Sequence, residues 1–139
     1  MLATLAFSAL MVISASKELH INKIVCYEKC PVHLVGRLDF VDAYGPPDFS
    51  GKDNDNKIKI PILKLSEKID VVEGAGFIAQ NDVDKVQVDG DVSTDMNGRF
   101  ISVDGVIRGA TTATDIELIV IKAAKVSCIS CNADPRDAR

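Results

Sequence analysis

Hydrophobic and polar residues alternate along two stretches of this chain, and such alternation is typical of β-strands. One face of the first stretch carries Val32, Leu34, Leu38 and Phe40, and the other carries His33, Arg37 and Asp39. This pattern predicts a strand with one buried face. The second stretch, Lys57–Leu65, alternates and then changes phase near Pro61, which predicts a β-bulge or an edge strand.

The segment Val92–Gly105 predicts a β-hairpin. Its corner is Asn97-Gly98, a strong hairpin signal because both residue types tolerate the positive φ of tight hairpin turns. Thr94 and Asp95 can bond back to nearby backbone amides and so hold the start of the turn. We therefore expect the runs on either side of this corner, the second beginning near Phe100, to pair as neighbouring strands.

Further strands are predicted on both sides of this hairpin. Phe77–Ala79 and Val83–Val88 are short candidates. Ile116–Ile121 is almost continuously apolar and rich in β-branched residues, which favours a central strand covered on both faces, although a short buried helix fits the same pattern. With turn signals at close intervals and no persuasive amphipathic helix, the chain predicts an all-β fold. We expect an antiparallel, immunoglobulin-like β-sandwich of about seven strands.

The length, hydrophobic content and net charge of the chain limit the classes of protein to which it can belong. The chain has 139 residues, of which 47% are hydrophobic, and this is enough to bury one sizeable core. Its formal net charge of -4 argues against nucleic-acid binding, because binding to phosphates requires clustered Lys and Arg. We expect no nucleic-acid partner.

The segment Met1–Ser16 has the pattern of a signal peptide. It is apolar from Leu2 to Ile13 and then carries small residues, so cleavage is expected after Ser16. The alternative is a buried first strand or helix of a cytosolic protein. No later segment approaches the roughly 20 apolar residues that span a bilayer, so we do not expect an integral membrane protein. The expected division is a signal peptide at 1–16, one domain at 17–131 and a polar tail at 132–139.

Four cysteines lie near the two ends of the expected domain: Cys26, Cys30, Cys128 and Cys131. In an oxidising compartment this even number predicts disulfides, with three possible pairings. Bonds between the two ends would close a loop of about 100 residues, worth about 4–5 kcal/mol in the chain-entropy model, and we expect the ends to be tied in this way. The alternative is an intracellular module with a structural zinc site, because C-x3-C and C-x2-C offer four thiolates.

Candidate catalytic groups are few. His20 and His33 are the two imidazoles, and both are expected on a solvated surface. No G-x-S-x-G motif accompanies them, and disulfide pairing would remove any cysteine nucleophile. Asp53 and Asp55 lack the glycine and the bidentate glutamate of a calcium loop. We therefore predict no catalytic residue, metal or cofactor, with a small hydrolase that uses His20 or His33 as a further alternative.

Four features follow one another along the chain: Thr94–Phe100, Gly105, Leu118–Ile121 and Cys128. Their order resembles that of the nematode transthyretin-like family of small secreted proteins, which typically has T-D-x-x-G-x-F, a later glycine, and a hydrophobic strand leading to a cysteine. Upstream, Val35–Leu38 is similar to the family's first-strand V-x-G-x-L pattern, and Ile62–Glu67 is similar to its second-strand V-K-L-x-D/E. The resemblance covers much of Val32–Cys128.

The resemblance implies a prealbumin-like β-sandwich over 17–131, secretion, and a binding or bridging role outside the cell. The motif residues would then be structural: Gly36, Leu38, Thr94, Asp95, Gly98, Phe100 and Gly105. We therefore expect a secreted, non-enzymatic binding protein that presents loops or an edge strand to an extracellular or cell-surface protein or lipid. Tyr44–Asn56 is expected to be its most distinctive exposed loop.

Overall fold

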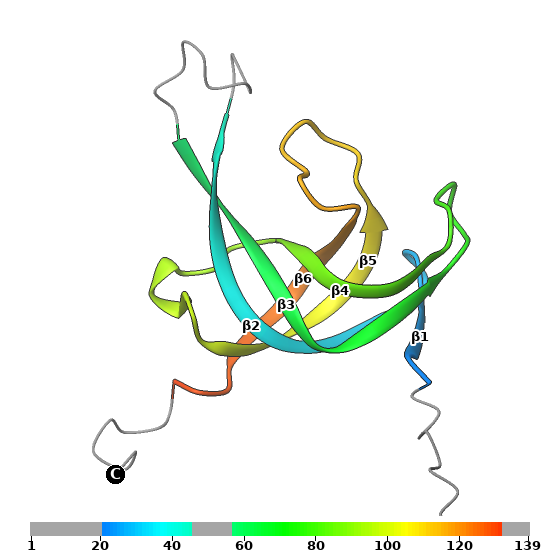
Figure 1. Ribbon diagram of the computed structural model, residues 1–139, viewed down its shortest axis with the longest axis horizontal. Helices are drawn as coiled ribbons and strands as arrows, with labels where there is room; N and C mark the ends of the chain where they lie inside the picture. Colours follow the sequence, from blue (N-terminus) through cyan, green and yellow to red (C-terminus); the bar gives the residue numbers. More distant parts are fainter. Residues whose placement is uncertain (1–20, 46–56, 132–139) are drawn as a thin grey trace, which may run out of the picture.

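The computed structural model describes residues 21–45 and 57–131. These residues form six β-strands and one turn of 3-10 helix: β1 Lys23–Cys26, β2 Pro31–Tyr44, β3 Lys57–Val72, β4 Gln80–Asp89, η1 Thr94–Met96, β5 Phe100–Gly109 and β6 Ile119–Cys128 (Figure 1). The prediction of an all-β fold is confirmed. The predicted signal peptide, His20, most of the Tyr44–Asn56 loop and the polar tail lie outside the described residues.

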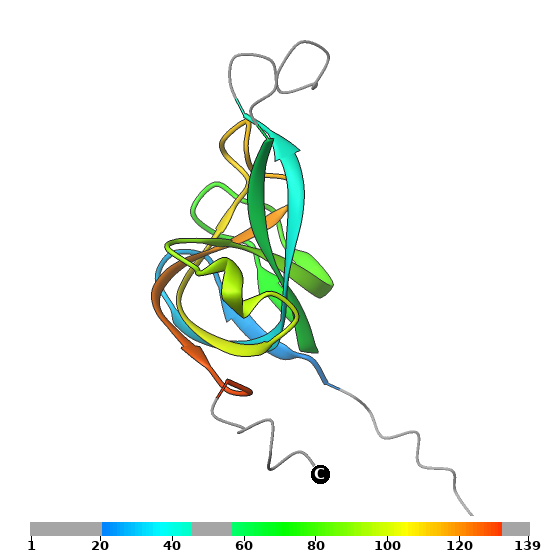
Figure 2. The same cartoon turned by 90° about the vertical axis from the view of Figure 1, so that its left-hand side faces the viewer.

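The six strands form one sheet, in the order β1-β3-β2-β5-β6-β4, and β4 also pairs with β3. Strands β2 to β6 therefore make a closed circuit, and Figure 2 shows the sheet curling around its interior. Opposite sides of this closed sheet face each other as in a sandwich, with one core between them. A five-stranded Greek-key barrel closed in the order β2-β3-β4-β6-β5 has the connectivity of the OB-fold, which differs from that of the immunoglobulin-like or prealbumin-like sandwich expected from the sequence.

Two of the strand pairings differ from the predicted arrangement. β1 runs parallel to β3, and β4 runs parallel to β6. The prediction of a purely antiparallel sheet is therefore wrong, and the described residues contain six strands, where about seven were expected. Each parallel pair joins two strands that have another strand between them in the sequence, and local patterns do not specify such pairings.

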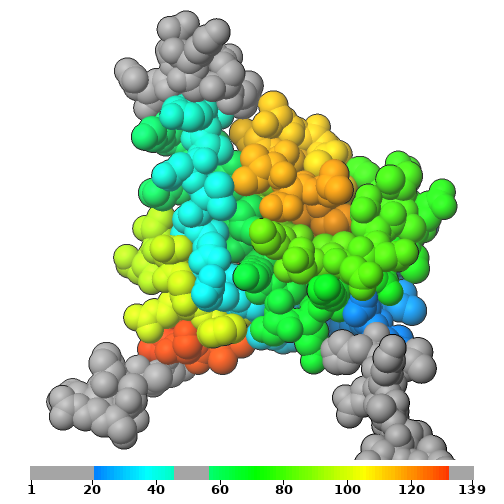
Figure 3. Space-filling view, viewed as in Figure 1, coloured from blue at the N-terminus to red at the C-terminus, as the bar shows by residue number. Residues whose placement is uncertain are grey.

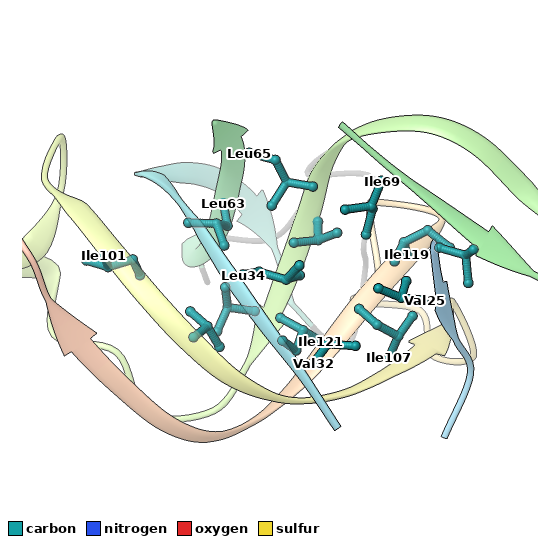
Figure 4. Packing of buried hydrophobic residues seen from close by; sticks show 14 of the residues in the cluster. Val25, Val32, Leu34, Leu63, Leu65, Ile69, Ile101, Ile107, Ile119 and Ile121 are labelled. Carbon is teal, nitrogen blue, oxygen red and sulfur yellow. The ribbon is translucent and has the colours of Figure 1, made fainter. Parts of the chain in front are cut away.

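The core is built from the apolar faces of all six strands. The alternation predicted for β2 is confirmed, because Val32, Leu34 and Leu38 are only 6%, 3% and 0% exposed. The largest fully buried side chains are Leu38, Leu63, Ile69, Ile101, Ile107, Ile119 and Ile121. Figure 4 shows members of this cluster converging from several strands. Each such side chain contributes roughly 1.5–3 kcal/mol on burial.

The predicted hairpin around Asn97 is wrong. Residues 90–99 connect β4 to β5, which are not neighbours in the sheet, and Thr94–Met96 forms a 3-10 turn. Gly98 does adopt the expected positive φ, at 76°. Its N–H donates to the Leu38 carbonyl (2.6 Å), so this turn packs against β2 and does not join two paired strands. Phe77–Ala79 is likewise not a strand, whereas Val83–Val88 lies within β4.

Both disulfides are local. Cys26 pairs with Cys30 and Cys128 pairs with Cys131, at sequence separations of 4 and 3. The expectation that sulfur ties the two ends of the domain together is therefore wrong. None of the four cysteines is free, so no thiolate is available for the zinc site considered as an alternative.

The Cys26–Cys30 bond closes the turn between β1 and β2. Within that turn Tyr27 is 3% exposed, and its hydroxyl donates to the Ile78 carbonyl at 2.6 Å. Glu28 adopts a φ of 58°, and its N–H donates to the Ile107 carbonyl. Because a non-glycine residue at positive φ is strained, we infer that the disulfide helps to keep Tyr27 in the core.

We expect the double variant Cys128→Ser/Cys131→Ser to remain folded. A loop this short contributes about 2 kcal/mol in the chain-entropy model, less than half the value for a loop of about 100 residues. Urea unfolding at pH 7, followed by circular dichroism, should show a loss of that size or smaller. A variant that is unfolded without urea would contradict the local role of this bond.

Candidate functional site

The best-defined candidate for a binding site is the connection between β5 and β6, residues 110–118, which we call the clamped loop. The sequence predicted a buried strand over Ile116–Ile121, but β6 begins only at Ile119. Ile119–Ile121 is buried as expected, whereas Ile116 and Leu118 are 46% and 68% exposed. The first half of this prediction is therefore wrong, and its apolar residues face outward on a loop.

A buried carboxylate holds one end of the clamped loop. The side chain of Asp115 is 3% exposed and forms a two-pronged ion pair with Arg108, at 2.8 and 3.4 Å. The Asp115 carboxylate also accepts hydrogen bonds from the amides of Thr111 (2.8 Å) and Thr112 (3.0 Å). Arg108 additionally contacts Asp89 on β4 at 3.2 Å. The loop is thus fastened to two strands.

These contacts shift the acid–base equilibrium of Asp115. Burial alone would raise its pKa, but the hydrogen bonds from Arg108 and from the amides of Thr111 and Thr112 outweigh burial and hold the pKa well below its usual value. The Asp115 carboxylate is therefore ionised at neutral pH. Hydrogen bonding to Asp115 in turn raises the pKa of Arg108.

Gln87 holds the other end of the clamped loop. This β4 residue is 6% exposed, and its Oε1 accepts the amides of Ile116 (2.8 Å) and Glu117 (3.4 Å). Its Nε2 donates to the Thr114 carbonyl at 3.2 Å. One amide side chain therefore satisfies three backbone groups of the loop. No buried side-chain nitrogen or oxygen in the described part of the chain lacks a hydrogen-bond partner.

Beside Leu118 the surface is hollowed. A pocket of about 200 Å³ lies between the loop and β4, and its lining includes Leu118, Glu117, Asp82, Asp84 and Lys85. Figure 3 shows the clamped loop, in orange, on the molecular surface next to green segments that include β4. The region combines an exposed leucine with a mainly acidic hollow.

The sequence contained a weak signal for this site. Gln87 interrupts an otherwise apolar run between Val86 and Val88, and all three are buried. A buried polar residue must find hydrogen-bond partners, but the sequence alone does not identify them as backbone groups of residues 114–117. Arg108 and Asp115 are seven residues apart, with a loop between them, and no sequence motif predicted their ion pair.

The predicted structural residues are distributed over the barrel and do not form one site. Leu38 is fully buried, whereas Phe100 is 48% exposed at the start of β5. Thr94 and Asp95 lie in the exposed 3-10 turn, where the amide of Asp95 donates to Ser93 Oγ. This contact differs from the predicted one, in which Thr94 and Asp95 themselves accept.

The remaining motif glycines lie at close crossings of strands. A Cβ atom at Gly36 would lie 2.8 Å from the carbonyl carbon of Lys64, and one at Gly105 would lie 2.9 Å from that of Lys122. Both glycines allow neighbouring backbones to approach where a side chain would collide.

The described residues provide limited chemistry for catalysis or metal binding. His33 Nδ1 lies 2.6 Å from Asp104 Oδ1, and both side chains are exposed, which agrees with the solvated face predicted for His33. In the described ranges, no group of three or more His, Cys, Asp or Glu residues could hold a metal ion.

The part of the chain that is described contains no helix with the length and hydrophobicity needed to cross a membrane. No family model, no curated protein and no solved structure matches this chain.

Proposed function

We propose that this chain is a secreted, non-enzymatic binding protein that docks an extracellular or cell-surface protein through the clamped loop. Two disulfides support an oxidising compartment for the protein. The observation that carries the proposal is the combination, in one short loop, of a buried polar clamp with two large apolar side chains facing solvent.

A rigid loop with exposed apolar side chains is suited to binding. Asp115 and Gln87 already order the loop backbone, so little conformational entropy remains to be lost when a partner docks. Leu118 can then be buried without remodelling of the loop. Apolar side chains that are held on a preorganised loop are suited to an interface.

The surroundings of Leu118 indicate the chemistry of the partner. Asp84 and Glu117 line the adjacent hollow and form no ion pair within the described residues. A complementary partner would present an apolar side chain next to Lys or Arg. The same carboxylates would repel the phosphates of a nucleic acid.

The barrel connectivity offers a further, fold-level argument. In OB-type barrels the loop between the fourth and fifth barrel strands is one of the two principal binding loops, and the clamped loop occupies this position between β5 and β6. Fold analogy does not identify a ligand. It does favour the same end of the barrel as a binding surface.

We expect Leu118→Ser to weaken capture of the partner at least tenfold while leaving stability within about 0.5 kcal/mol, because an exposed side chain contributes little to the fold. The measurement is photo-crosslinking in extracellular fluid from a probe placed, in every variant, at the exposed loop residue Ala113, followed by titration of the crosslinked partner. Ile78→Ser is the matched control, because Ile78 is 70% exposed on another loop. Equal crosslinking by wild type and Leu118→Ser would contradict the proposed site.

Secretion is tested separately by intact mass spectrometry of the native protein. The proposal expects a chain that begins at Lys17 and is lighter by one proton mass for each of its four bridged sulfurs. A full-length, fully reduced chain would contradict secretion without bearing on the geometry of the loop.

A further inference from the structure

The barrel wall is interrupted where β1 and β2 both lie beside β3. β2 leaves β3 at the pair Gly36–Leu65, and β1 joins β3 at the pair Lys23–Ile69. Among the described residues, no strand partner pairs with the intervening residues Ser66, Glu67 and Lys68. We call this interruption the strand gap, and define it by Lys23 of β1, His33–Val35 of β2 and Leu65–Ile69 of β3.

The backbone of β2 presents hydrogen-bonding groups to the strand gap. The N–H and C=O of Leu38 bond to residues 99 and 98, on the β5 side of β2. Because backbone direction alternates along a strand, the N–H and C=O of His33 and Val35 point to the opposite side, toward the strand gap. The contact between Lys23 Nζ and the His33 carbonyl, at 3.3 Å, agrees with this direction.

The strand gap also contains a hollow large enough for a side chain. A pocket of about 340 Å³ is lined by residues of all three strands, among them Leu34, Leu65 and Ile69. Figure 4 shows these three side chains within the hydrophobic cluster. An apolar side chain that entered from outside would therefore meet an apolar floor.

Two charged side chains at the strand gap limit which ligands can bind there. Lys23 and Glu67 both line the pocket, and neither forms an ion pair within the described part of the chain. Lys23 can pair with one carboxylate of a ligand, whereas Glu67 would repel a run of acids. The favoured ligand is thus extended, apolar and singly acidic at the point of contact.

We propose that the strand gap binds an extended peptide segment of a partner protein, which adds to β2 as a further strand. The segment bonds to the backbone of His33 and Val35, places one apolar side chain in the pocket, and sets an adjacent carboxylate beside Lys23. This proposal rests on the binding role proposed above but uses a different surface, so the two can fail independently.

The test uses the purified, oxidised protein and the peptide acetyl-Thr-Val-Asp-Val-Thr-amide, compared with the same peptide carrying Asn or Lys in place of Asp. Amide hydrogen exchange by NMR should show protection at His33 and Val35 on saturation with the Asp peptide. From the size of an exposed ion pair, we expect the Asp peptide to bind about threefold to fivefold more tightly than the Asn peptide.

Charge-reversal substitutions distinguish a specific contact with Lys23 from a general effect of the protein's net charge. Lys23→Glu should weaken binding of the Asp peptide about tenfold and make the Lys peptide the better ligand. Lys85→Glu is the matched control, because Lys85 is an exposed β4 residue that does not line this pocket. Absence of protection at His33 and Val35, or equal weakening by both substitutions, would overturn the proposal. The Leu118→Ser variant should bind these peptides as the wild type does.

Discussion

Replacement of Gly36 by alanine is expected to lower the free energy of unfolding by about 3 kcal/mol, at the upper end of the usual cost of overpacking. Gly36 lies where β2 crosses from its pairing with β5 to its pairing with β3. An added Cβ would lie 2.8 Å from the carbonyl carbon of Lys64 and closer still to its oxygen. Those atoms are backbone of a central strand, so they cannot move without breaking the β2–β3 ladder.

Urea unfolding at pH 7 measures this loss, and Gly74→Ala is the matched control. An added Cβ at Gly74 would meet no atom within 4 Å, and that glycine does not adopt a positive φ. We expect Gly74→Ala to change stability by less than about 1 kcal/mol, because it mainly restricts the unfolded chain. If the two variants were equally stable, the close approach of β2 and β3 would be refuted.

Replacement of Asp115 by alanine is expected to cost about 2–3 kcal/mol at pH 7. The substitution removes the ion pair with Arg108, which is itself largely buried at 19% exposure, and leaves the amides of Thr111 and Thr112 without their acceptor. Because the partially exposed guanidinium can rehydrate, we place the cost below the full range for a buried pair. Asp91→Ala removes an exposed carboxylate of the same charge and should change stability by less than about 0.5 kcal/mol.

The same variant predicts how stability depends on pH. The pKa of Asp115 is lower in the folded protein than in the unfolded chain, where the pKa of Asp is about 4. Its contribution is therefore fully present above that pH and is lost as the pH falls below it. Unfolding free energies measured at pH 7, 5 and 3 should show the difference between wild type and Asp115→Ala shrinking at pH 3. A difference that stays constant would show that the carboxylate is not held in its charged form.

Sequence patterns marked Gly36 as a structural residue, but they did not mark Asp115. Gly36 stood in a strand pattern where a missing side chain suggests a close backbone approach, and the motif resemblance also marked it as structural. Its partner, the Lys64 carbonyl, could not be identified, because pairing between β2 and β3 depends on the path of the chain. Asp115 preceded an apolar run, but its partner Arg108 lies across a loop whose conformation exists only in the folded protein.

The hairpin prediction failed for a related reason. Gly98 does supply the positive φ that its sequence context predicted. That conformation, however, is compatible with many turns, and this turn is held by hydrogen bonds to β2 and not by a paired neighbour strand. The prediction of a positive φ at Gly98 was thus correct, whereas the prediction that the two flanking runs pair with each other was wrong.

The sequence by itself determined the all-β class, the inward face of β2 and the oxidised state expected of four cysteines, because alternation and residue chemistry act over a few neighbouring residues. Only the tertiary structure decided which strands adjoin, that each cysteine pairs locally, and that Ile116 and Leu118 face solvent. Closure of the barrel brings distant strands together, and the polar clamp of Arg108, Asp115 and Gln87 then turns the start of an apolar run outward. Such outcomes depend on contacts between residues far apart in the chain, and these contacts have no counterpart in local hydrophobic pattern.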